Sequence, residues 1–599
     1  MKIIKNNLFM LKYIWNTNKI YFIGMVFVKS IFSAINTTID VLIIKYIIDL
    51  VFIEGSLIEI IILLLIKNLV SIIVYLLDLH LNTVVTPKIS IILSRKLNEE
   101  IINKAQKIDL ECYDNNEFYN NYTKALLETD NRVWSVFNNI ISLFSNIFTT
   151  IGIISVILSI DPILIIFVTI TILIRTFIIP KINKIRYNFN QERTGLDRKI
   201  AFYKSSFHTR EYAKDIRTIE NLGNILKLKF KYYTEEYLKL NNKYTKKIYK
   251  KISIINLADI IFANLIPYAY LVLQGYMKRI TIGSIGTLFS AMHTLSYAIS
   301  GILNCVIEMS NNNLYINNYK YILNYKCKIE VEDNSIECKY IDTIEFKNVY
   351  FKYTDNSDYV LKDINFKINK NEKLAIIGYN GAGKSTIIKL LLRLYDVTSG
   401  EILINDSNIK SFNIETLRYK FSVMFQDYNL YPFTLIENLT FNINNDINNE
   451  KIAAEALNKI GLYDKVFKSE EKLNTNVTKK FDNNGIIFSG GEEQKLAIAR
   501  SYILKSSIDA FIFDEPSSAL DPISEDNFYK NVLEIVDNKI SVFITHKMSL
   551  LNIMDKICLL ENGVIIEFGK FNDLMNNSEK FYNYYSTQAK YYNVNYELK

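Results

Sequence analysis

The hydrophobic pattern divides the chain into two unlike parts. Through residue 308 the apolar runs are long, and several could cross a bilayer, whose hydrocarbon core needs about 20 residues of helix. After residue 340 the apolar runs shorten to strand length and alternate with helix-like periodicity. We count six candidate spans, at approximately 20–50, 57–81, 133–158, 162–183, 254–277 and 282–308. The pattern therefore predicts an all-α transmembrane domain of six helices, followed by an α/β domain.

Two long charged loops separate the spans, one between the second and third and one between the fourth and fifth. Both have a helical pattern, so we expect the spans to continue beyond the bilayer. Their tips, at 113–119 and 210–217, are candidates for short helices that dock on the second domain; a solvated helix end is the alternative. The second loop, 184–251, carries 18 Lys and Arg against 7 Asp and Glu, a net charge of +11. By the positive-inside rule this loop, both termini and the second domain are cytoplasmic.

Composition narrows the class of protein. Hydrophobic residues make up 49% of the 599 residues and mean hydropathy is +0.08, as expected for an average over a membrane half and a soluble half. The five cysteines are scattered without zinc-ligand spacing, so we expect neither a disulfide framework nor a structural metal. The net charge of +8 suits the anionic inner leaflet of the cytoplasmic membrane, and no nucleic-acid surface is apparent.

Several charged residues fall within the predicted spans, where charge is costly unless it faces water or a partner. Lys67 lies ten residues into the second span, and at about 1.5 Å rise per residue that places it roughly 15 Å deep. It is a candidate to line a polar substrate cavity, together with Arg175 and Asp259. An internal salt bridge of purely structural purpose explains Lys67 equally well.

A glycine-rich stretch in the second half is built to wrap phosphates. A short apolar strand, 373–377, precedes it, and an amphipathic helix, 387–394, follows. Backbone N–H groups and the helix N-terminus would face the phosphates, Lys384 would reach the terminal ones, and Ser385 would offer a hydroxyl to Mg²⁺. The expected ligands are ATP and Mg²⁺. The stretch is Gly378, Tyr379, Asn380, Gly381, Ala382, Gly383, Lys384, Ser385 and Thr386.

Further motifs follow in order. Tyr353 lies 25 residues ahead of Gly378 and is a candidate to stack on adenine, with Tyr350 as its rival. Asp514, at the end of an apolar strand, can hold Mg²⁺ through water, and the adjacent Glu515 can act as general base. The other motifs are 425–427 with Gln426, 488–492 with Ser489, Gly490 and Gly491, 518–521 with Ser518 and Asp521, and 545–546 with His546.

These motifs together resemble the ordered set of ABC-transporter ATPase domains, over residues 340 to about 575. With six spans ahead of it, the whole chain resembles an ABC exporter half-transporter. Gln426 can join the Mg²⁺ shell and report the γ-phosphate, and His546 can bind that phosphate and orient the attacking water. Ser489 opens a helix and forms a second anion site, which in the family serves the partner subunit's ATP. The resemblance thus implies a head-to-tail dimer with two ATP molecules between the ATPase domains.

Two positions depart from the family pattern: Phe488 stands where Leu is usual, and Glu492 where Gln is usual. A carboxylate near a nucleotide could loosen the dimer slightly. Because Lys384, Glu515, His546 and the signature stretch are all present, no rescuing partner is required, and both a homodimer and a heterodimer stay open. We expect domain limits of 1–325 for the transmembrane domain, 326–339 for the linker and 340–599 for the nucleotide-binding domain with a C-terminal helix.

The leading functional hypothesis is ATP-driven export of a peptide, a lipid or a hydrophobic compound. The alternative is an ATP-gated channel or membrane-bound regulator that uses the same ATPase cycle. A soluble ABC ATPase is disfavoured by the six spans. An importer is disfavoured because most importers keep their spans and their ATPase on separate chains.

Overall fold

The computed structural model describes residues 2–52, 56–329, 335–354, 357–442, 447–517 and 522–593. The chain forms two compact units. The first consists of Met1–Lys107 and Glu117–Tyr325, and the second of Ile108–Asn116 and Lys326–Lys599. The short segment Ile108–Asn116, from the tip of the first long loop, therefore packs with the C-terminal unit.

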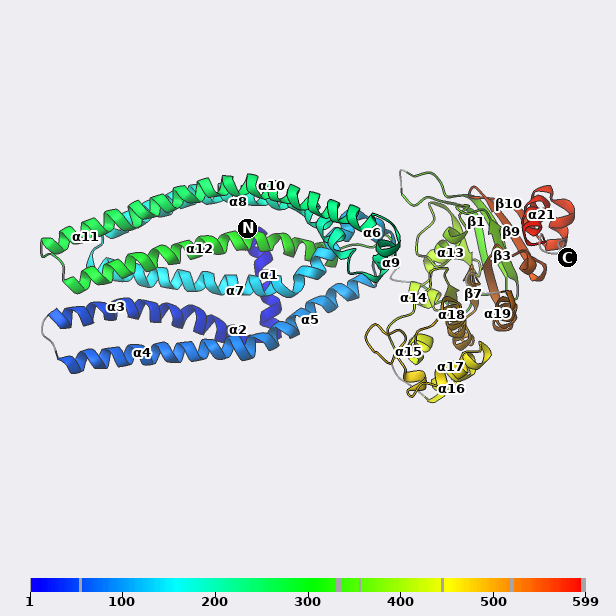
Figure 1. Cartoon of the computed structure of the whole chain (residues 1–599), viewed down its shortest axis with the longest axis horizontal. Helices are drawn as coiled ribbons and strands as arrows, with labels where there is room; N and C mark the ends of the chain where they lie inside the picture. The colour runs from blue at the N-terminus through cyan, green and yellow to red at the C-terminus, as the bar shows by residue number, and fades with distance from the viewer. Residues whose placement is uncertain are drawn as a thin grey trace. The chain divides into compact units, whose positions relative to one another are not determined.

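The first unit is built from long helices. In the described part of the chain, six helical segments are long and apolar enough to cross a membrane: Lys19–Phe52, Leu57–Ala105, Arg132–Ile160, Leu164–Ser205, Leu222–Tyr276 and Ile282–Leu323. The predicted six-helix domain is confirmed, and several of these helices run well beyond the length that a bilayer needs. Figure 1 shows them extended along one another. They comprise α2 (Lys19–Val26), α3 (Ser33–Phe52), α4 (Leu57–His80), α5 (Thr86–Ala105), α7 (Asn116–Ile160), α8 (Leu164–Ser205), α10 (Leu222–Ala258), α11 (Ile266–Tyr276) and α12 (Ile282–Leu323).

Three spans contain a π-helical turn, in which the helix widens locally. These turns are η1 (Phe27–Phe32), η2 (Leu81–Val85) and η3 (Asp259–Leu265). Single π-helical turns inside longer helices are frequent at functional sites. Two of the turns carry a charged residue, Lys29 in η1 and Asp259 in η3.

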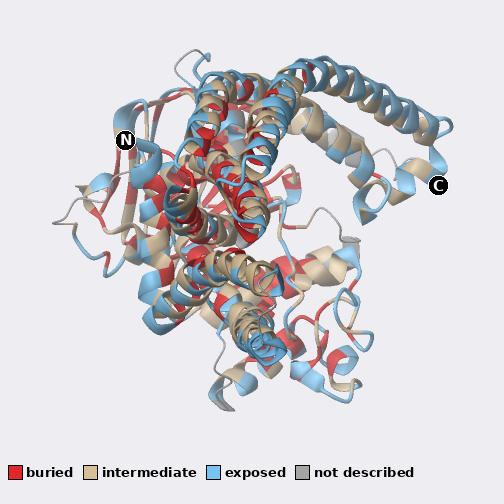
Figure 2. Ribbon diagram, turned by 90° about the vertical axis from the view of Figure 1, so that its left-hand side faces the viewer, coloured by how far each residue is buried: buried red, intermediate tan, exposed pale blue. Residues whose placement is uncertain are grey.

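Burial separates the outer from the inner faces of these helices. In Figure 2 exposed residues cover the outer faces of the long helices, and buried residues gather where helices meet. Helix α4 has no buried residue, in keeping with a lipid-facing position, whereas Ile153, Leu271 and Leu295 belong to a buried cluster shared by five spans. Apolar side chains thus serve both as core and as lipid contact.

The N-terminal helix α1 (Lys2–Thr17) packs through one face. Asn6, Asn7, Met10 and Ile14 are buried, and α1 lies against α12 and α5. Asn6 donates hydrogen bonds to Asn313 and Asn317 of α12 at 2.8 and 2.9 Å. The polar, Asn-rich sequence after residue 310 is therefore part of a helix that continues to Leu323.

The second unit contains two sheets. A four-stranded antiparallel sheet has the order β2 (Leu361–Asn369), β1 (Thr343–Phe351), β4 (Ser399–Ile404), β5 (Ser407–Asn408). A six-stranded sheet has the order β10 (Val564–Gly569), β9 (Lys556–Glu561), β3 (Lys373–Gly378), β8 (Ile540–Ile544), β7 (Ala510–Asp514), β6 (Phe421–Met424). The predicted α/β domain is confirmed.

Helices cover the six-stranded sheet, whose central strands are almost wholly apolar because both faces are buried. Strands β3, β8, β7 and β6 are parallel, so their carboxyl ends meet at one edge of the sheet. The helices of this unit are α6 (Glu111–Asp114), α13 (Lys384–Leu391), α14 (Ile414–Arg418), α15 (Leu435–Thr440), α16 (Ile447–Lys459), α17 (Tyr463–Phe467), α18 (Gly490–Leu504), α19 (Pro522–Ile535), α20 (Phe571–Asn577) and α21 (Glu579–Asn593).

Candidate active site

The glycine-rich loop connects β3 to α13, as its flanking pattern predicts. Gly378 has a φ of 148°, and a Cβ there would lie 2.1 Å from the carbonyl oxygen of Leu560, so only glycine fits. Gly383 caps α13 with a φ of 103°. The buried Lys384 side chain folds back over the loop, and its Nζ donates to the carbonyls of Gly378 and Tyr379 at 2.7 and 3.2 Å. The loop and its lysine thus form one rigid, positively charged cradle.

Two carboxylates stand side by side at the end of β7. Asp514 is buried and accepts a hydrogen bond from the Ser385 hydroxyl at 3.0 Å. Burial raises the pKa of Asp514, and the Ser385 hydroxyl opposes that shift. Glu515 has a φ of 48°, a left-handed conformation that costs a non-glycine residue about 1–2 kcal/mol. Its N–H donates to the Ile544 carbonyl at 3.0 Å, which holds this strained backbone against β8.

The Glu515 carboxylate collects two partners from neighbouring strand ends. Gln426 donates to Oε2 at 3.0 Å, and Nε2 of His546 lies 3.1 Å from Oε1. The same His546 nitrogen is 3.3 Å from Nζ of Lys384. Burial lowers the pKa of His546 and the charge of Lys384 lowers it further, whereas Glu515 opposes both. His546 is therefore neutral at pH 7, able to accept or donate a hydrogen bond without carrying charge.

All four predicted catalytic side chains line one cavity of about 700 Å³. Two further residues of the lining, Val360 and Gln588, were not predicted from the sequence. The full lining is Val360, Asn380, Gly381, Ala382, Gly383, Lys384, Ser385, Thr386, Gln426, Glu515, His546 and Gln588. Gln588 comes from the C-terminal helix α21, which lies against the loop through Tyr584, whose ring is 5.5 Å from that of Tyr379. No local motif marks Gln588, because its position depends on how α21 packs.

Tyr353, the expected adenine-stacking residue, is not among the residues that line this cavity. Its hydroxyl shares a hydrogen bond with Thr386 at 3.1 Å, and its ring packs edge-on against Phe351 and Tyr395. Nζ of Lys389 lies 5.4 Å from the ring centroid. Tyr353 is therefore anchored to the phosphate loop, and its stacking on adenine stays a prediction. Its rival Tyr350 packs edge-on against Tyr359.

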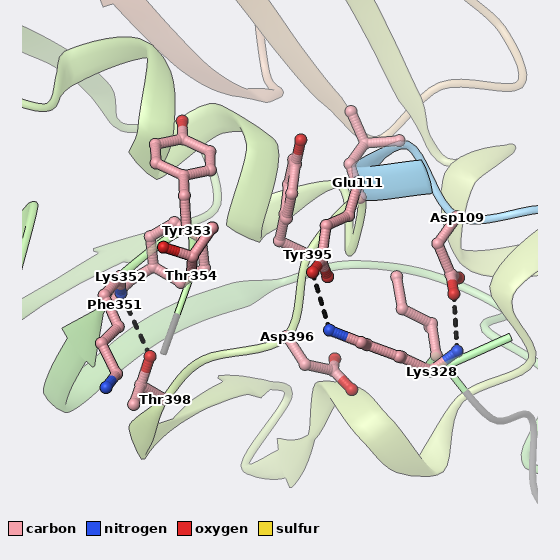
Figure 3. Close-up of a pocket in the computed structure, with 12 residues that line it drawn as sticks. Asp109, Glu111, Lys328, Phe351, Lys352, Tyr353, Thr354, Tyr395, Asp396 and Thr398 are labelled. Carbon is pink, nitrogen blue, oxygen red and sulfur yellow. Dashed lines mark hydrogen bonds and ion pairs between the residues drawn. The ribbon is translucent and has the colours of Figure 1, made fainter. Parts of the chain in front are cut away.

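Tyr353 instead lines a second cavity, of about 300 Å³, shown in Figure 3. Its opposite wall is the first-loop segment Ile108–Asn116. There the Glu111 carboxylate pairs with Nζ of Lys328 at 2.7 Å, and the Asp109 carboxylate accepts from the backbone N–H of Lys328. The first loop thus docks on the second domain as expected, but through Ile108–Asn116 and its helix α6, a few residues before the predicted segment 113–119. The second loop tip forms helix α9 (Arg210–Thr218) within the other unit.

The signature stretch begins helix α18 as predicted. Ser489 is its N-cap and forms a capping box with Glu492, whose carboxylate accepts from the Ser489 N–H at 2.7 Å. The Tyr428 hydroxyl donates to the Gly490 carbonyl at 2.9 Å, which links this helix to the Gln426 loop. Ser489, Gly490 and Gly491 do not line the cavity around Lys384.

One lysine contacts both residues that depart from the family pattern. Nζ of Lys465 donates to Glu492 at 2.6 Å and lies 5.0 Å from the centroid of the Phe488 ring. Burial alone would raise the pKa of Glu492, but hydrogen bonds from Lys465 and Ser489 outweigh it, and the net shift is downward. Glu492 is therefore ionised at pH 7, with its charge compensated by Lys465.

Three side chains near the phosphate loop carry oxygens that suit Mg²⁺. Mg²⁺ prefers hard oxygen ligands and is usually bound by one or two carboxylates together with substrate phosphates and water. The Ser385 hydroxyl, the Asp514 carboxylate and the Gln426 side-chain amide supply such oxygens. No cluster of three His, Cys, Asp or Glu side chains in the described residues could hold a metal by itself. The predicted residues Ser518 and Asp521 lie outside the described residues.

The structure pairs the candidate charges of the membrane domain. Nζ of Lys67 lies 3.7 Å from Asp40 of the first span. Arg175 is buried, and its guanidinium binds Asp259 and the Ser300 hydroxyl. A role for these side chains in a substrate cavity stays a prediction.

The comparisons with known proteins agree with this geometry. Residues 361–518 match the ABC transporter family. The chain is 27% identical over 483 residues to the subtilin transport ATP-binding protein SpaT of Bacillus subtilis, covering 80% of this chain and 77% of SpaT. It is 31% identical over 299 residues to the ATP-dependent lipid A-core flippase of Escherichia coli (strain K12), covering half of each. The chain carries an ABC transporter ATPase domain and is homologous to ABC exporters.

The fold of the transporter is shared along nearly its whole length. A solved structure of a bacterial Atm1-family ABC exporter with ATP bound superposes with a TM-score of 0.78 at 18% identity, covering 95% of this chain and 98% of the other. Six spans and one ATPase domain make the transporter an exporter-type half-transporter, a multi-pass membrane protein that binds nucleotide and couples ATP hydrolysis to export.

Proposed function

We propose that two copies of this transporter form a head-to-tail dimer that exports peptides, with two ATP molecules at the interface between the ATPase domains. Each site combines the Lys384 cavity of one copy with the Ser489 helix start of the other. The gathering of Lys384, Gln426, Glu515 and His546 around one cavity is the observation that carries the proposal. The position of Ser489 outside that cavity supports a site completed by a second chain.

Each residue has a distinct task in this proposal. The loop N–H groups and Lys384 bind the phosphates, and the helix dipole of α13 adds positive potential. Glu515 accepts a proton from the attacking water, and neutral His546 orients that water against the γ-phosphate. Gln426 touches Glu515 directly, so its loop senses whether the γ-phosphate is present. The Tyr428 contact with Gly490 then passes that state to α18.

We also propose that Ser385, Gln426 and Asp514 hold Mg²⁺, which neutralises phosphate charge when bound. The Ser385–Asp514 hydrogen bond keeps both oxygens directed at the same point beside the phosphate loop. Adenine stacking is assigned to Tyr353, which its contact with Thr386 holds near that loop. Ser518 and Asp521 are assigned to the interface between the two ATPase domains.

For the membrane half, we propose cytoplasmic termini and a cytoplasmic ATPase domain, on the strength of the +11 charge of residues 184–251. The proposed domain limits stay 1–325, 326–339 and 340–599, with Ile108–Asn116 and the linker packing in the C-terminal unit. Peptide cargo is favoured because SpaT, which aligns with 80% of this chain, transports the peptide subtilin. For Lys67 the proposed role is the internal ion pair with Asp40, and no contact with cargo is assigned to it. The buried pair of Arg175 and Asp259 supports the same role between the fourth and fifth spans.

A mixed dimer tests the composite ATP site. One copy carries Lys384→Ala and the other Ser489→Arg, with different affinity tags so that only mixed dimers are purified. If each site uses two chains, the mixed dimer has one site with both defects and one intact site. It should then hydrolyse ATP while each parent homodimer is inactive. A mixed dimer as inactive as its parents contradicts the composite site.

A further inference from the structure

A polar cavity of about 470 Å³ lies between the first three spans of the membrane domain. It is lined by one face of each helix, because the lining positions recur at helical spacing. Its polar lining includes Lys29, Asn36, Ser71, Asp78, Ser145 and Asn146. Lipid-facing surfaces do not gather charges and amides in this way, so the cavity belongs to the interior of the membrane domain.

The first two spans meet along a ladder of polar pairs. Nζ of Lys29 lies 3.6 Å from Asp78, and the Ser71 hydroxyl donates to Asn36 at 3.2 Å. Further toward the other end of the same helices, Lys67 lies 3.7 Å from Asp40. From Lys29 to Asn36 to Asp40 the first span advances by seven and then four residues, and from Asp78 to Ser71 to Lys67 the second span runs back by the same numbers. The pairing is thus a regular antiparallel register, in which Lys29 with Asp78 and Asn36 with Ser71 line the cavity, whereas Lys67 and Asp40 do not.

The carboxylates at both ends of the ladder, Asp78 and Asp40, have a buried oxygen with unused bonding capacity, but only Asp78 lines the cavity. Oδ1 of Asp78 is buried and has no hydrogen-bond partner among the described residues. The Lys29 ammonium, at 3.6 Å, is too far for a hydrogen bond to it. The other carboxylate oxygen of Asp78 is oriented by Asn82 of η2 at 2.9 Å. Lys29 itself sits in the π-helical turn η1. A buried acceptor and an ion-paired cation that lies beyond hydrogen-bond distance can each take a ligand group.

We propose that this cavity binds the exported peptide, with Lys29 receiving a carboxylate, Asp78 an ammonium or guanidinium, and the neighbouring amides and hydroxyls the peptide main chain. The inference rests on the proposed function and assigns its cargo site. The two opposite charges decide the class of ligand. A lipid phosphate would call for cations without an adjacent carboxylate, and an apolar compound for an apolar lining. Peptides present both charges and many main-chain donors and acceptors.

A pooled library of random 20-residue peptides tests the assignment. The dimer in detergent is incubated with the library without ATP, and the retained peptides are sequenced by mass spectrometry. Wild type should enrich peptides that carry both charges. Lys29→Met should retain acidic peptides about tenfold less, and Asp78→Asn should retain basic peptides about tenfold less, the loss expected when one partner of a charge pair is removed. The double reversal Lys29→Asp with Asp78→Lys keeps an ion pair and should still enrich mixed charges.

The matched control is the double variant Lys67→Met with Asp40→Asn, which removes an ion pair from the same two helices outside the cavity. It should keep the wild-type enrichment. The proposal is overturned if the Lys67→Met with Asp40→Asn control changes the enrichment as much as Lys29→Met or Asp78→Asn does. It is also overturned if Lys29→Met and Asp78→Asn retain the same peptides as wild type, or if the dimer retains phospholipid and no peptide. ATP hydrolysis by the wild type, measured in parallel, separates this failure from that of the proposed function. Hydrolysis survives a wrong cargo site and fails with a wrong ATP site.

Discussion

Lys465 offers a sharp test of how the ATPase domain tolerates a carboxylate in its signature helix. Glu492 shares the first turn of α18 with Ser489, beside the phosphate that the proposed dimer places there. Lys465 binds that carboxylate at 2.6 Å. Replacing Lys465 by Met removes the compensating charge and leaves the carboxylate in place. We therefore expect weaker ATP binding across the dimer interface.

The size of the effect follows from Coulomb's law. Two unit charges about 8 Å apart at an effective dielectric constant of about 20 repel by roughly 2 kcal/mol. The Lys465 and Glu492 side chains are 38% and 26% exposed, so solvent and salt screen a good part of this repulsion. About 1 kcal/mol remains, which corresponds to a roughly fivefold rise in the KM for ATP.

A double-mutant cycle measures how far Lys465 offsets the repulsion between Glu492 and the bound nucleotide. The KM for ATP is determined for wild type, Lys465→Met, Glu492→Gln and the double variant, at low and high salt. Lys465→Met should raise the KM about fivefold, Glu492→Gln should change it less than about twofold, and the double variant should return close to wild type. Lost packing against Phe488 appears in both backgrounds and cancels. An equal rise in the Glu492→Gln background, or a rise that salt does not reduce, refutes the charge argument.

Three further predictions concern His546, Gln588 and the buried pair of Arg175 and Asp259. Because burial and the charge of Lys384 lower the pKa of His546, its neutral form persists to lower pH. The kcat for ATP hydrolysis should stay level from pH 8 to about 6.5 and fall only below that, as a pH profile would show. Gln588→Ala removes one neutral hydrogen bond to nucleotide, worth about 0.5–1.5 kcal/mol, so the KM for ATP should rise severalfold at constant kcat. Asp259→Asn leaves a buried guanidinium uncompensated at a cost of about 3–5 kcal/mol, so thermal unfolding in detergent should begin at clearly lower temperature.

For each of these three predictions, one outcome would contradict the reasoning. If kcat falls to half its maximum above pH 6.5, and this fall is absent from a His546→Gln variant, the lowered pKa of His546 is contradicted. A Gln588→Ala variant with reduced kcat and unchanged KM contradicts a nucleotide contact. For the buried pair, the double variant Arg175→Met with Asp259→Leu serves as control, because it removes both charges and should unfold later than Asp259→Asn. Equal stability of the two variants means that the guanidinium finds another partner.

Local sequence determined much of this protein. The phosphate loop follows from glycine spacing, since Gly378 and Gly383 adopt backbone conformations that other residues rarely reach. The start of α18 follows from a capping box that needs only Ser489 and Glu492, three residues apart. The six spans follow from length and hydropathy, because in lipid a helix satisfies its own backbone hydrogen bonds. None of these features requires a distant partner.

Long-range packing decided the rest. Gln588 reaches the ATP cavity, Lys465 neutralises Glu492, and Asp78 meets Lys29 only once helices far apart in sequence have a fixed rotation and register. A hydropathy pattern gives the face of a helix that is apolar, but many rotations and partners satisfy the same pattern. Close packing selects one of them, because side chains interdigitate and the alternatives leave voids or unpaired charge. The elements and phosphate-binding motifs were thus determined by the sequence, and the partners of each charged side chain by the tertiary structure.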